Sequence, residues 1–170
     1  MTIDQAYPTL TASSTEVSLR RVTPANIAEI ITLQVRPEQE HIIPSNVQNL
    51  ADAFVSGWPV TAYGIYSGTL AVGFIMYACF HRESSQHWTD NSYFIWRFMI
   101  DARYQGQGLG RSALKKVIAD IRSLPAGKAE WIWLCYDATN PKAQRFYESC
   151  GLEEAPLRVP TDDPWLRLRI

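Results

Sequence analysis

The sequence predicts one mixed α/β domain in which strands and helices alternate, and three observations support this fold class. An almost wholly apolar segment at residues 93–100 runs through a glycine-rich turn into residues 112–122, whose apolar residues recur at helical spacing. A second apolar segment, residues 130–136, precedes a short stretch with helix-start and helix-stop residues. Residues 60–66 and 69–80 are strand-like and separated by two residues, which favours an antiparallel hairpin. Because 170 residues suit one domain with a substantial core, we assign the α/β (α+β) class.

The amino-terminal part of the chain predicts a loose tail, a strand and a helix. Residues 1–15 are rich in Ser and Thr and lack apolar periodicity, so we expect a flexible tail before a domain at residues 16–170. Residues 16–22 alternate apolar with polar residues and predict the first strand. Thr23, followed by proline, is the expected N-cap of the first helix. The buried stripe of that helix is expected at Ile27, Ile30, Ile31 and Val35.

An interrupted segment follows, in which Pro37 and Pro44 prevent a long helix. Ser45 is the expected N-cap of a second helix. The apolar residues of that helix are Val47, Leu50, Ala51 and Phe54. Irregular segments held by rigid helices often line binding sites, which makes Glu38, Glu40 and His41 candidates for substrate contact. Surface charges on a turn are the commoner explanation of such residues.

The predicted hairpin turns at Ser67-Gly68, and Gly73 within its second strand permits a bulge or a close approach of another backbone. The connection to the next strand, residues 81–91, is polar. It carries His81 and His87, which stand six residues apart with no cysteine or third histidine nearby. We therefore expect no metal site.

The glycine-rich turn at residues 105–111 has the character of an anion site. Its three glycines allow the backbone to turn tightly and to approach a ligand, and the unpaired N–H groups of the following helix can point at a phosphate. A Walker A loop is excluded because the required Lys-Ser/Thr is missing, and the dinucleotide fingerprint would place glycine where Arg111 stands. Taken alone, the motif is equally consistent with an ordinary strand-to-helix turn.

A second motif follows the strand at residues 130–136. Asn140 and Pro141 are the expected N-cap and first residue of a short helix, and Gly151 is its expected stop. Together the two motifs resemble those of the GNAT superfamily of N-acetyltransferases. Gln105, Gly108 and Gly110 fit its Gln-x-x-Gly-x-Gly loop. The helix fits its second signature at Asn140, Ala143, Phe146, Tyr147 and Gly151, with Leu152 replacing the usual aromatic residue.

The resemblance implies the GNAT acyl-CoA N-acyltransferase fold, which is a mixed, mostly antiparallel sheet with splayed central parallel strands flanked by helices. It also implies acetyl-CoA as the cosubstrate, with its pantetheine arm between those strands. Carried over residue by residue, the main chain of Phe98, Met99 and Ile100 would pair with the pantetheine amides. The pyrophosphate would lie on Gln105, Gly106, Gln107, Gly108, Leu109, Gly110 and Arg111, and Asn140 and Ala143 would border the cofactor.

In this family the acceptor amine attacks the thioester directly, without a covalent enzyme intermediate. We expect the backbone N–H of Met99 to stabilise the oxyanion and Tyr147 to donate to the leaving thiolate. Tyr147 stands seven residues after Asn140, two helical turns on, so the two side chains project from nearly the same face. The alternative for Tyr147 is a half-buried packing residue. The sequence does not reveal the general base.

Within the family, the chain resembles the bacterial polyamine N-acetyltransferases. The fitting positions are Val35, Gln39, Asn46, Leu50, Ala51, Asp52 and Ala53. Trp96 stands where those enzymes tend to carry aspartate, so it is either an aromatic contact for a cationic amine or a core residue. We favour spermidine or spermine as acceptor. The alternatives are another amine, in an amino acid, an antibiotic or a protein, and a non-catalytic acyl-CoA sensor.

Composition limits the kinds of binding partner and the cellular location that we expect for the protein. A net charge of -1, a pI near 6.3 and the absence of a Lys/Arg cluster argue against nucleic-acid binding. The three cysteines lack the spacing of a metal site or disulfide framework and are expected to be reduced core residues. With no secretion signal or long apolar span, we expect a cytoplasmic protein that does not contact membranes. A homodimer is possible, because dimers are frequent in families of this kind.

Overall fold

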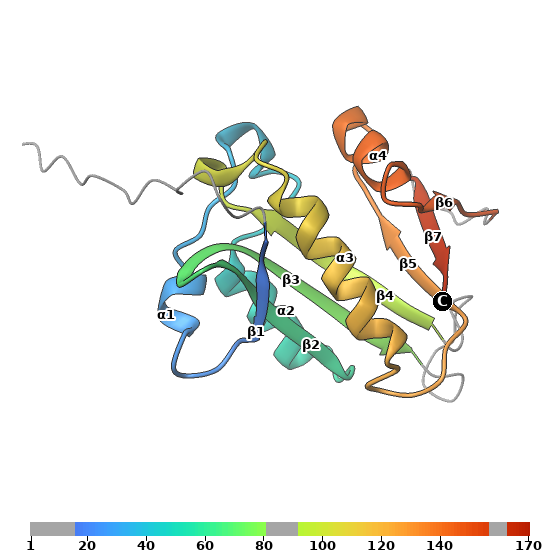
Figure 1. Cartoon of the computed structure of the whole chain (residues 1–170), viewed down its shortest axis with the longest axis horizontal. Helices are drawn as coiled ribbons and strands as arrows, with labels where there is room; N and C mark the ends of the chain where they lie inside the picture. The colour runs from blue at the N-terminus through green and yellow to red at the C-terminus, as the bar shows by residue number, and fades with distance from the viewer. Residues whose placement is uncertain (1–15, 81–91, 157–162) are drawn as a thin grey trace, which may run out of the picture.

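The computed structural model describes residues 16–80, 92–156 and 163–170, and these form a seven-stranded sheet with helices on both faces (Figure 1). The predicted tail at residues 1–15 and the histidines at 81 and 87 lie outside the described residues. The strands are β1 (Ser18–Arg21), β2 (Val60–Ser67), β3 (Leu70–Phe80), β4 (Ser92–Ile100), β5 (Trp131–Cys135), β6 (Glu153–Glu154) and β7 (Trp165–Arg169). The helices are α1 (Ile27–Ile30), α2 (Asn46–Val55), α3 (Leu109–Arg122) and α4 (Pro141–Glu148), with 3-10 turns η1 (Pro37–Gln39) and η2 (Ala102–Tyr104).

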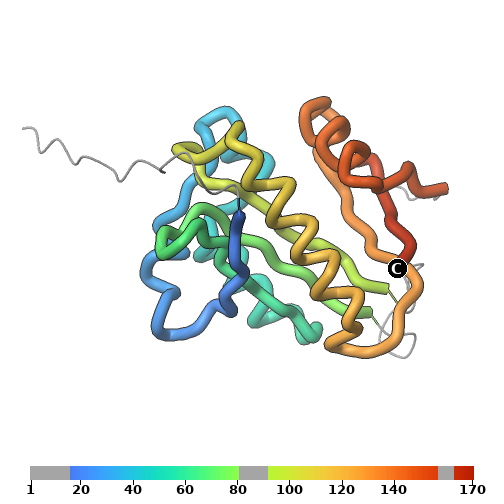
Figure 2. Tube along the Cα trace, in the orientation of Figure 1, coloured from blue at the N-terminus to red at the C-terminus, as the bar shows by residue number. Residues whose placement is uncertain are grey.

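The sheet opens between its two central strands. Its order is β1-β2-β3-β4-β5-β7-β6, and all neighbours are antiparallel except β4 and β5. These two parallel strands pair only where Ser92–Phe94 of β4 meets Trp131–Trp133 of β5. Toward their carboxyl ends they diverge, so that β5, β6, β7 and α4 form a wing separated from the rest of the sheet (Figures 1 and 2). This confirms the expected mostly antiparallel sheet with splayed parallel strands.

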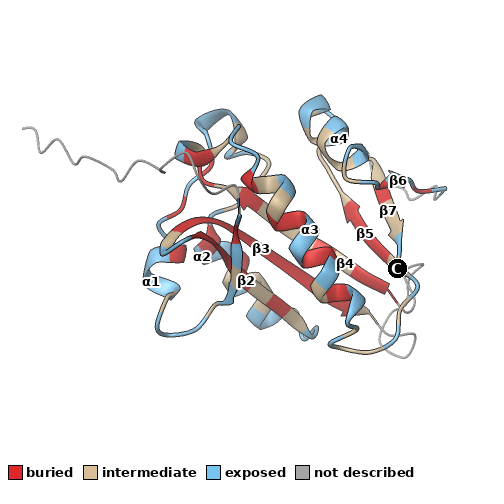
Figure 3. Cartoon of the chain, viewed as in Figure 1, coloured by how far each residue is buried: buried red, intermediate tan, exposed pale blue. Residues whose placement is uncertain are grey.

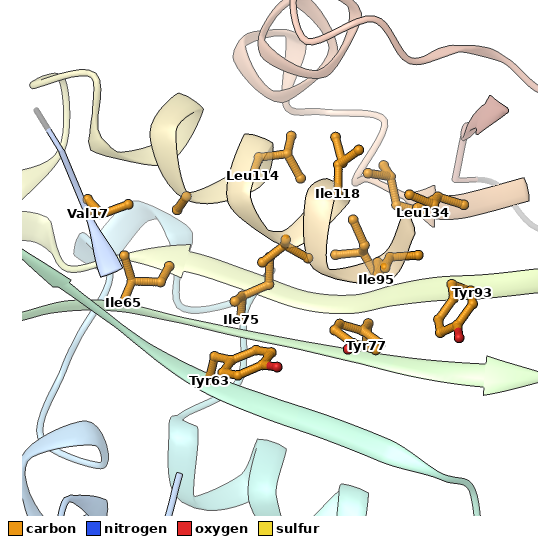
Figure 4. Packing of buried hydrophobic residues seen from close by; sticks show 14 of the residues in the cluster. Val17, Tyr63, Ile65, Ile75, Tyr77, Tyr93, Ile95, Leu114, Ile118 and Leu134 are labelled. Carbon is orange, nitrogen blue, oxygen red and sulfur yellow. The ribbon is translucent and has the colours of Figure 1, made fainter. Parts of the chain in front are cut away.

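The larger core lies between α3 and the sheet. The five α3 residues expected at its apolar face are all buried, namely Ala113, Leu114, Val117, Ile118 and Ile121. Figure 4 shows Leu114 and Ile118 over Ile75, Ile95 and Tyr77 of the strands, and Figure 3 shows burial concentrated on the central strands and α3. Burying one Leu or Ile side chain stabilises the fold by about 1.5–3 kcal/mol, so this face fixes the start of α3 firmly against β4.

A second core on the opposite face joins α1 and α2 to the sheet and includes Ile30, Phe74, Met76 and Met99. Of the three cysteines, Cys79 is buried in the larger core, while Cys135 and Cys150 are half-buried, and none of the three forms a disulfide among the described residues.

The first helix corrects two sequence-based expectations. Its N-cap is Asn26 rather than Thr23, whose N–H instead donates to Asn26 Oδ1 at 2.8 Å. Ile30 is fully buried, but Ile27 and Ile31 are 40% and 38% exposed. The reason is length: a helix of one turn can direct only one side chain into the core.

The second helix packs its expected Leu50 against the second core, but its buried residues are two asparagines, contrary to expectation. Asn46 and Asn49 are buried, whereas Val47 and Phe54 are 56% and 89% exposed. The partner beneath the helix explains this choice, because Arg97 of β4 donates from Nε to Asn49 Oδ1 at 2.9 Å. A half-buried guanidinium requires acceptors, and the two asparagines of α2 meet it with a connected polar network.

The predicted N-caps of α2 and α4 are confirmed. Ser45 Oγ accepts the N–H of Gln48 at 3.2 Å, and Asn140 Oδ1 accepts the N–H of Ala143 at 3.1 Å. Gly151 follows α4 with a φ of +92°, which supplies the left-handed residue that ends the helix. The first turn of α4 is therefore fixed in place beside the open end of β5.

The hairpin of β2 and β3 is confirmed, with its turn one residue later than expected, at Gly68-Thr69. Gly73 adjoins a register shift, and a Cβ built on it would lie 2.5 Å from the carbonyl oxygen of Met99. The expected close backbone approach therefore exists, and it packs β3 tightly against the strand that borders the opening.

Candidate active site

A cleft of about 470 Å³ occupies the opening between β4 and β5. Eleven of the residues predicted to bind cofactor or to act in catalysis line it: Phe98, Met99, Ile100, Gln105, Gly106, Gly108, Gly110, Arg111, Asn140, Ala143 and Tyr147. Leu109 is buried in the core and Gln107 is exposed, with its amide directed at the Arg103 carbonyl, so neither side chain faces the cleft. Only their backbone N–H groups remain for the predicted pyrophosphate contact.

Further cleft residues were not identified from the sequence. They are Val35, Gln39, Ile43, Tyr104, Lys142 and Phe146. Phe146 belongs to the helix motif, and its ring lies 6.0 Å from that of Phe98, centroid to centroid. A signal existed for Val35 and Gln39, because both fit the polyamine-enzyme pattern. Ile43, Tyr104 and Lys142 reach the cleft through the tertiary arrangement, which no signal in the sequence indicated.

The direction of the β4 backbone corrects the expected oxyanion donor. The N–H of Asp101 donates to the Val72 carbonyl at 2.9 Å, so these opposed residues form a hydrogen-bonded pair of the ladder. Hydrogen-bonded pairs alternate along antiparallel strands, which makes Met99 and Phe74 the next such pair. The close approach of the Met99 carbonyl to Gly73 agrees. The N–H of Met99 therefore points at β3, away from the cleft.

By the same alternation, the amide groups of Phe98 and Ile100 face the unpaired side of β4, where the cleft lies. The carbonyl of Ile100 confirms this direction, because it accepts a hydrogen bond from Gln105 Nε2 at 2.9 Å. An extended ligand with amide groups can add to such an open edge as a further strand would. The edge thus provides N–H and C=O groups from two residues.

A β-bulge at Trp96 precedes this edge. The register with β3 shifts between Met76 and Tyr77, which leaves Trp96 as the extra residue of β4. Its ring packs against Trp58 at 5.1 Å, centroid to centroid, and the guanidinium of Arg97 lies 5.2 Å from it. Trp96 does not line the cleft, and its ring already has a cationic neighbour within the chain. The geometry therefore favours the packing alternative over substrate contact.

The glycine turn leaves the start of α3 uncapped. Gly106 and Gly108 have φ values of +82° and +80°, in the left-handed region that favours glycine. Gly108 is the N-cap and offers no side chain to the N–H groups of the first turn. These donors, at the positive end of a 14-residue helix, are therefore open to an anion.

Gln105 fastens the glycine turn to two other elements. Its Nε2 donates to the Ile100 carbonyl and, at 2.8 Å, to Gln39 Oε1. Gln39 Oε1 also accepts the N–H of Arg36 at 3.2 Å. This set of contacts, which we call the Gln105 clasp, joins the end of β4, the glycine turn and η1. The side chain predicted to contact pyrophosphate is thus engaged within the protein.

Asp101 is a buried carboxylate that directly follows Ile100 of the cleft lining. The carboxylate is 2% exposed and accepts from the Arg103 guanidinium at 2.7 and 2.9 Å and from the N–H of Gln34 at 3.0 Å. Burial pushes the pKa of Asp101 upward, but the hydrogen bonds from Arg103 and Gln34 outweigh it and hold the pKa below its usual range. Asp101 therefore stays ionised and ties the segment after α1 to the end of β4.

Tyr147 projects from α4 into the cleft. Its ring packs against Phe146 and Tyr136, with centroids 5.1 and 6.5 Å away, and its hydroxyl has no hydrogen-bond partner among the described residues. Burial, with smaller effects of Cys135 and Cys150, raises the pKa of Tyr147 well above its ordinary value. The hydroxyl is therefore protonated at neutral pH and free to donate.

Arg111 connects the two helices that flank the cleft. Its guanidinium donates to the Ser149 carbonyl and to Ser149 Oγ, each at 2.7 Å, and so joins the first turn of α3 to the end of α4. The Arg111 guanidinium, which was predicted to bind the pyrophosphate, thus lines the cleft and is hydrogen-bonded to the residue that follows α4.

A smaller cavity of about 290 Å³ meets the cleft at Val35, Ile43 and Met99. Glu40 is the one charged residue in its lining; the other polar side chains there, such as Asn46, are neutral. Glu38 lies elsewhere, in a hollow of about 450 Å³ whose lining includes Arg36, His41 and Lys142. The structure therefore separates the two glutamates that the sequence grouped as substrate contacts.

Within the part of the chain that the structure describes, no group of three or more His, Cys, Asp or Glu residues could hold a metal ion. In the same residues, no helix combines the length and apolar character needed to cross a membrane.

The splayed parallel strands, the open helix start and the tyrosine on the facing helix define an acyl-CoA-type acyltransferase cleft. Comparison with known proteins agrees: residues 23–152 match the Acetyltransferase (GNAT) family. The chain is 35% identical to the spermine/spermidine N(1)-acetyltransferase of Bacillus subtilis (strain 168) over 144 residues, which cover 81% of this chain and 88% of that protein. The protein belongs to the GNAT family of acetyltransferases, and acetyl-CoA is its cosubstrate.

Solved structures show the same fold. Spermidine N-acetyltransferase from Vibrio cholerae, in complex with CoA and spermine, has a TM-score of 0.69 at 15% identity, covering 92% of this chain and 96% of that chain. Aminoglycoside acetyltransferase AAC(6')-Ib, in complex with coenzyme A, has a TM-score of 0.72 at 17% identity, covering 91% and 95%.

Proposed function

We propose that this N-acetyltransferase acetylates a primary amine of a polyamine, with spermidine and spermine as the favoured acceptors. The observation that carries the proposal is the cavity beside Met99, which reaches the cofactor cleft and has Glu40 as its one charged residue. A carboxylate there attracts a cationic amine toward the thioester. The identity to a spermine/spermidine acetyltransferase over most of both chains supports the same acceptor class.

In the proposed reaction, the free amine attacks the thioester carbonyl carbon directly. A lysine-like amine has a pKa near 10.4, so fewer than about one molecule in a thousand is uncharged at pH 7 and the nitrogen must lose a proton. N–H groups on the cleft side of β4, at Phe98 and Ile100, stabilise the oxyanion. The new C–N bond forms and the C–S bond breaks.

The leaving sulfur is stabilised by Tyr147, whose protonated hydroxyl lines the cleft. Tyr147 donates a hydrogen bond to the sulfur as negative charge develops on it. The proton lost by nitrogen passes to water, and the thiolate takes a proton from water, so the overall reaction yields N-acetylamine and CoA thiol.

The acceptor is tested by thiol release from acetyl-CoA with spermine, spermidine, putrescine, lysine, kanamycin and a short peptide. Highest kcat/KM for spermine or spermidine supports the proposal; no polyamine turnover, or clear preference for another amine, overturns it. Glu40→Gln should raise the polyamine KM about fivefold, as for the loss of one partly exposed ion pair, with the KM for acetyl-CoA unchanged.

Glu38→Gln is the matched control. The substitution removes the same charge from the same segment, but Glu38 lines a different hollow from Glu40. Equal effects of the two substitutions would show that general charge, rather than the cavity, attracts the acceptor. A cytoplasmic location and a homodimer, both expected from the sequence, stay predictions.

A further inference from the structure

Gln39 is the central hydrogen-bonding residue of the segment between α1 and α2. Its N–H donates to the Arg36 carbonyl at 2.8 Å, and its carbonyl accepts the N–H groups of Ile42 and Ile43, each at 3.0 Å. Its side-chain Oε1 accepts the N–H of Arg36 at 3.2 Å. One residue therefore folds residues 36–43 into a single compact unit, which we call the Gln39 turn.

The Gln39 turn contributes to the walls of both the cofactor cleft and the cavity proposed for the acceptor. Gln39 lines the cleft, Glu40 lines the cavity, and Ile43 lines both. The N–H of Glu40 donates to the Pro37 carbonyl at 3.3 Å, so Glu40 is held within the turn. A displacement of Gln39 therefore displaces the Glu40 carboxylate as well.

Two contacts tie this stretch of chain to the end of β4 and the residues that follow it. At Gln34, the N–H donates to Asp101 Oδ2 at 3.0 Å and the carbonyl accepts the N–H of Ala102 at 2.8 Å. This contact fixes the residues before the Gln39 turn. The other contact belongs to the Gln105 clasp, in which Gln105 Nε2 donates to Gln39 Oε1 at 2.8 Å. Through this bond the position of the glycine turn acts directly on Gln39.

The glycine turn is the part of this set of contacts that a bound cosubstrate restrains. Gly106 and Gly108 have left-handed φ values, and the N–H groups at the start of α3 are open to an anion. Glycine loses more conformational freedom on ordering than any other residue, so a diphosphate bound there restrains both the turn and the Gln105 side chain. A second ligand that requires the same order then binds at a lower entropic cost.

We propose that Gln39 is a positioning residue that couples the two substrates. Cosubstrate on the glycine turn favours the Gln105–Gln39 hydrogen bond, which holds the Gln39 turn and its Glu40 carboxylate in the position that receives the amine. Such a coupling is reciprocal, so each substrate strengthens the binding of the other by the same factor. The inference rests on the proposed function in one respect, the place of the acceptor beside Glu40.

The first test uses no amine. Adenosine 3′-phosphate 5′-diphosphate carries the diphosphate of coenzyme A but no pantetheine arm that could touch the Gln39 turn. At saturation it should slow the amide hydrogen exchange of residues 36–43, measured by mass spectrometry on the full-length protein, about fivefold, as for one added hydrogen bond. In Gln39→Met, which keeps the length of the side chain but offers Gln105 no oxygen, the slowing should be less than about twofold.

Two variants complete this test. Gln39→Glu keeps the acceptor oxygen and should restore the slowing, and Glu38→Gln, a neighbouring substitution outside the clasp, should leave it intact. Equal slowing in the wild type and Gln39→Met, or no slowing in the wild type with the nucleotide bound, would overturn the proposal. Because no acceptor is present, either result is independent of the polyamine assignment.

The second test measures the coupling itself as the ratio of the CoA dissociation constants without and with saturating spermine, by calorimetry. The ratio should be about fivefold in the wild type and below about twofold in Gln39→Met and Gln105→Met, with no further fall in the double variant. A purely structural role would change both constants equally and leave the ratio as it is, which would overturn the proposal, as would a wild-type ratio near one. If the acceptor test selects another amine of its panel, that amine replaces spermine, so failure of the polyamine assignment leaves this test in force.

Discussion

Tyr147→Phe should separate the chemical role of this residue from its packing role. The ring contacts with Phe146 and Tyr136 are made by carbon atoms, and phenylalanine keeps them. The hydroxyl has no hydrogen-bond partner among the described residues, so its removal leaves no buried group unpaired. We therefore expect the free energy of unfolding to change by less than about 0.5 kcal/mol.

The effect on turnover should be much larger. A positioned proton donor contributes about 10²- to 10⁴-fold to rate. Because burial raises the pKa of Tyr147, its hydroxyl is a weak acid that stabilises the leaving sulfur by hydrogen bonding, which places the effect at the lower end of that range. We expect kcat to fall about 100-fold, equivalent to about 2.7 kcal/mol in the barrier, with the KM for acetyl-CoA changed by less than about threefold.

Steady-state thiol release and urea unfolding of the same preparations test this prediction. Tyr136→Phe is the matched control, because it removes a half-buried hydroxyl from the partner ring, which does not line the cleft. A fall in kcat of less than about threefold for Tyr147→Phe, or equal falls for the two variants, would refute the assigned role.

Two further predictions concern stability. Gly73→Ala places a Cβ 2.5 Å from the Met99 carbonyl oxygen and should lower the free energy of unfolding, measured in urea, by about 1–3 kcal/mol. Gly110→Ala is the control, because its Cβ meets nothing nearer than 3.6 Å, and it should change the free energy of unfolding by less than about 1 kcal/mol. Equal effects of the two substitutions would contradict the inferred spacing of β3 and β4. The lowered pKa of Asp101 means that its stabilisation is present above its unfolded pKa, about 3.9, and is lost as pH falls through the folded value. Asp101→Asn should therefore lower Tm at pH 7, and below pH 4 the Tm of the variant should fall less steeply with pH than that of the wild type. If Tm falls equally steeply in both proteins, other carboxylates determine the acid unfolding.

Local chemistry was predictable from the sequence where one residue determines its own conformation. Gly108 adopts a left-handed backbone within the tight turn expected of the glycines, and Asn140 caps its helix as predicted. Tertiary pairing was not predictable in the same way. The rule that apolar residues face inward fails for Phe54, because the surface beneath α2 carries the Arg97 guanidinium and so requires the polar side of the helix.

The backbone direction along β4 was also beyond sequence reasoning. A run of apolar residues in a strand buried on both faces gives no alternation from which to count, so Met99 and Phe98 could not be told apart as donors to the cleft. The hydrogen bond from the Asp101 N–H to the Val72 carbonyl shows which N–H groups of β4 point at β3 and which point at the cleft. The segment of β4 that lines the cleft was thus predicted, whereas the backbone N–H groups that face the cleft lie one residue to either side of the predicted one.

The bulge at Trp96 places two consecutive residues of β4, Trp96 and Arg97, on the same face of the sheet. Ile95 packs toward α3 and Arg97 contacts α2, so two residues apart in sequence lie on opposite faces, which a regular strand does not allow. Deleting this single residue would leave Ile95 and Arg97 in regular alternation and keep the faces of the residues that follow, but it would remove the bend and the added twist that a bulge gives a strand. The one inserted position therefore bends β4 between its pairing with β5 at Ser92–Phe94 and the residues 98–100 that line the cleft.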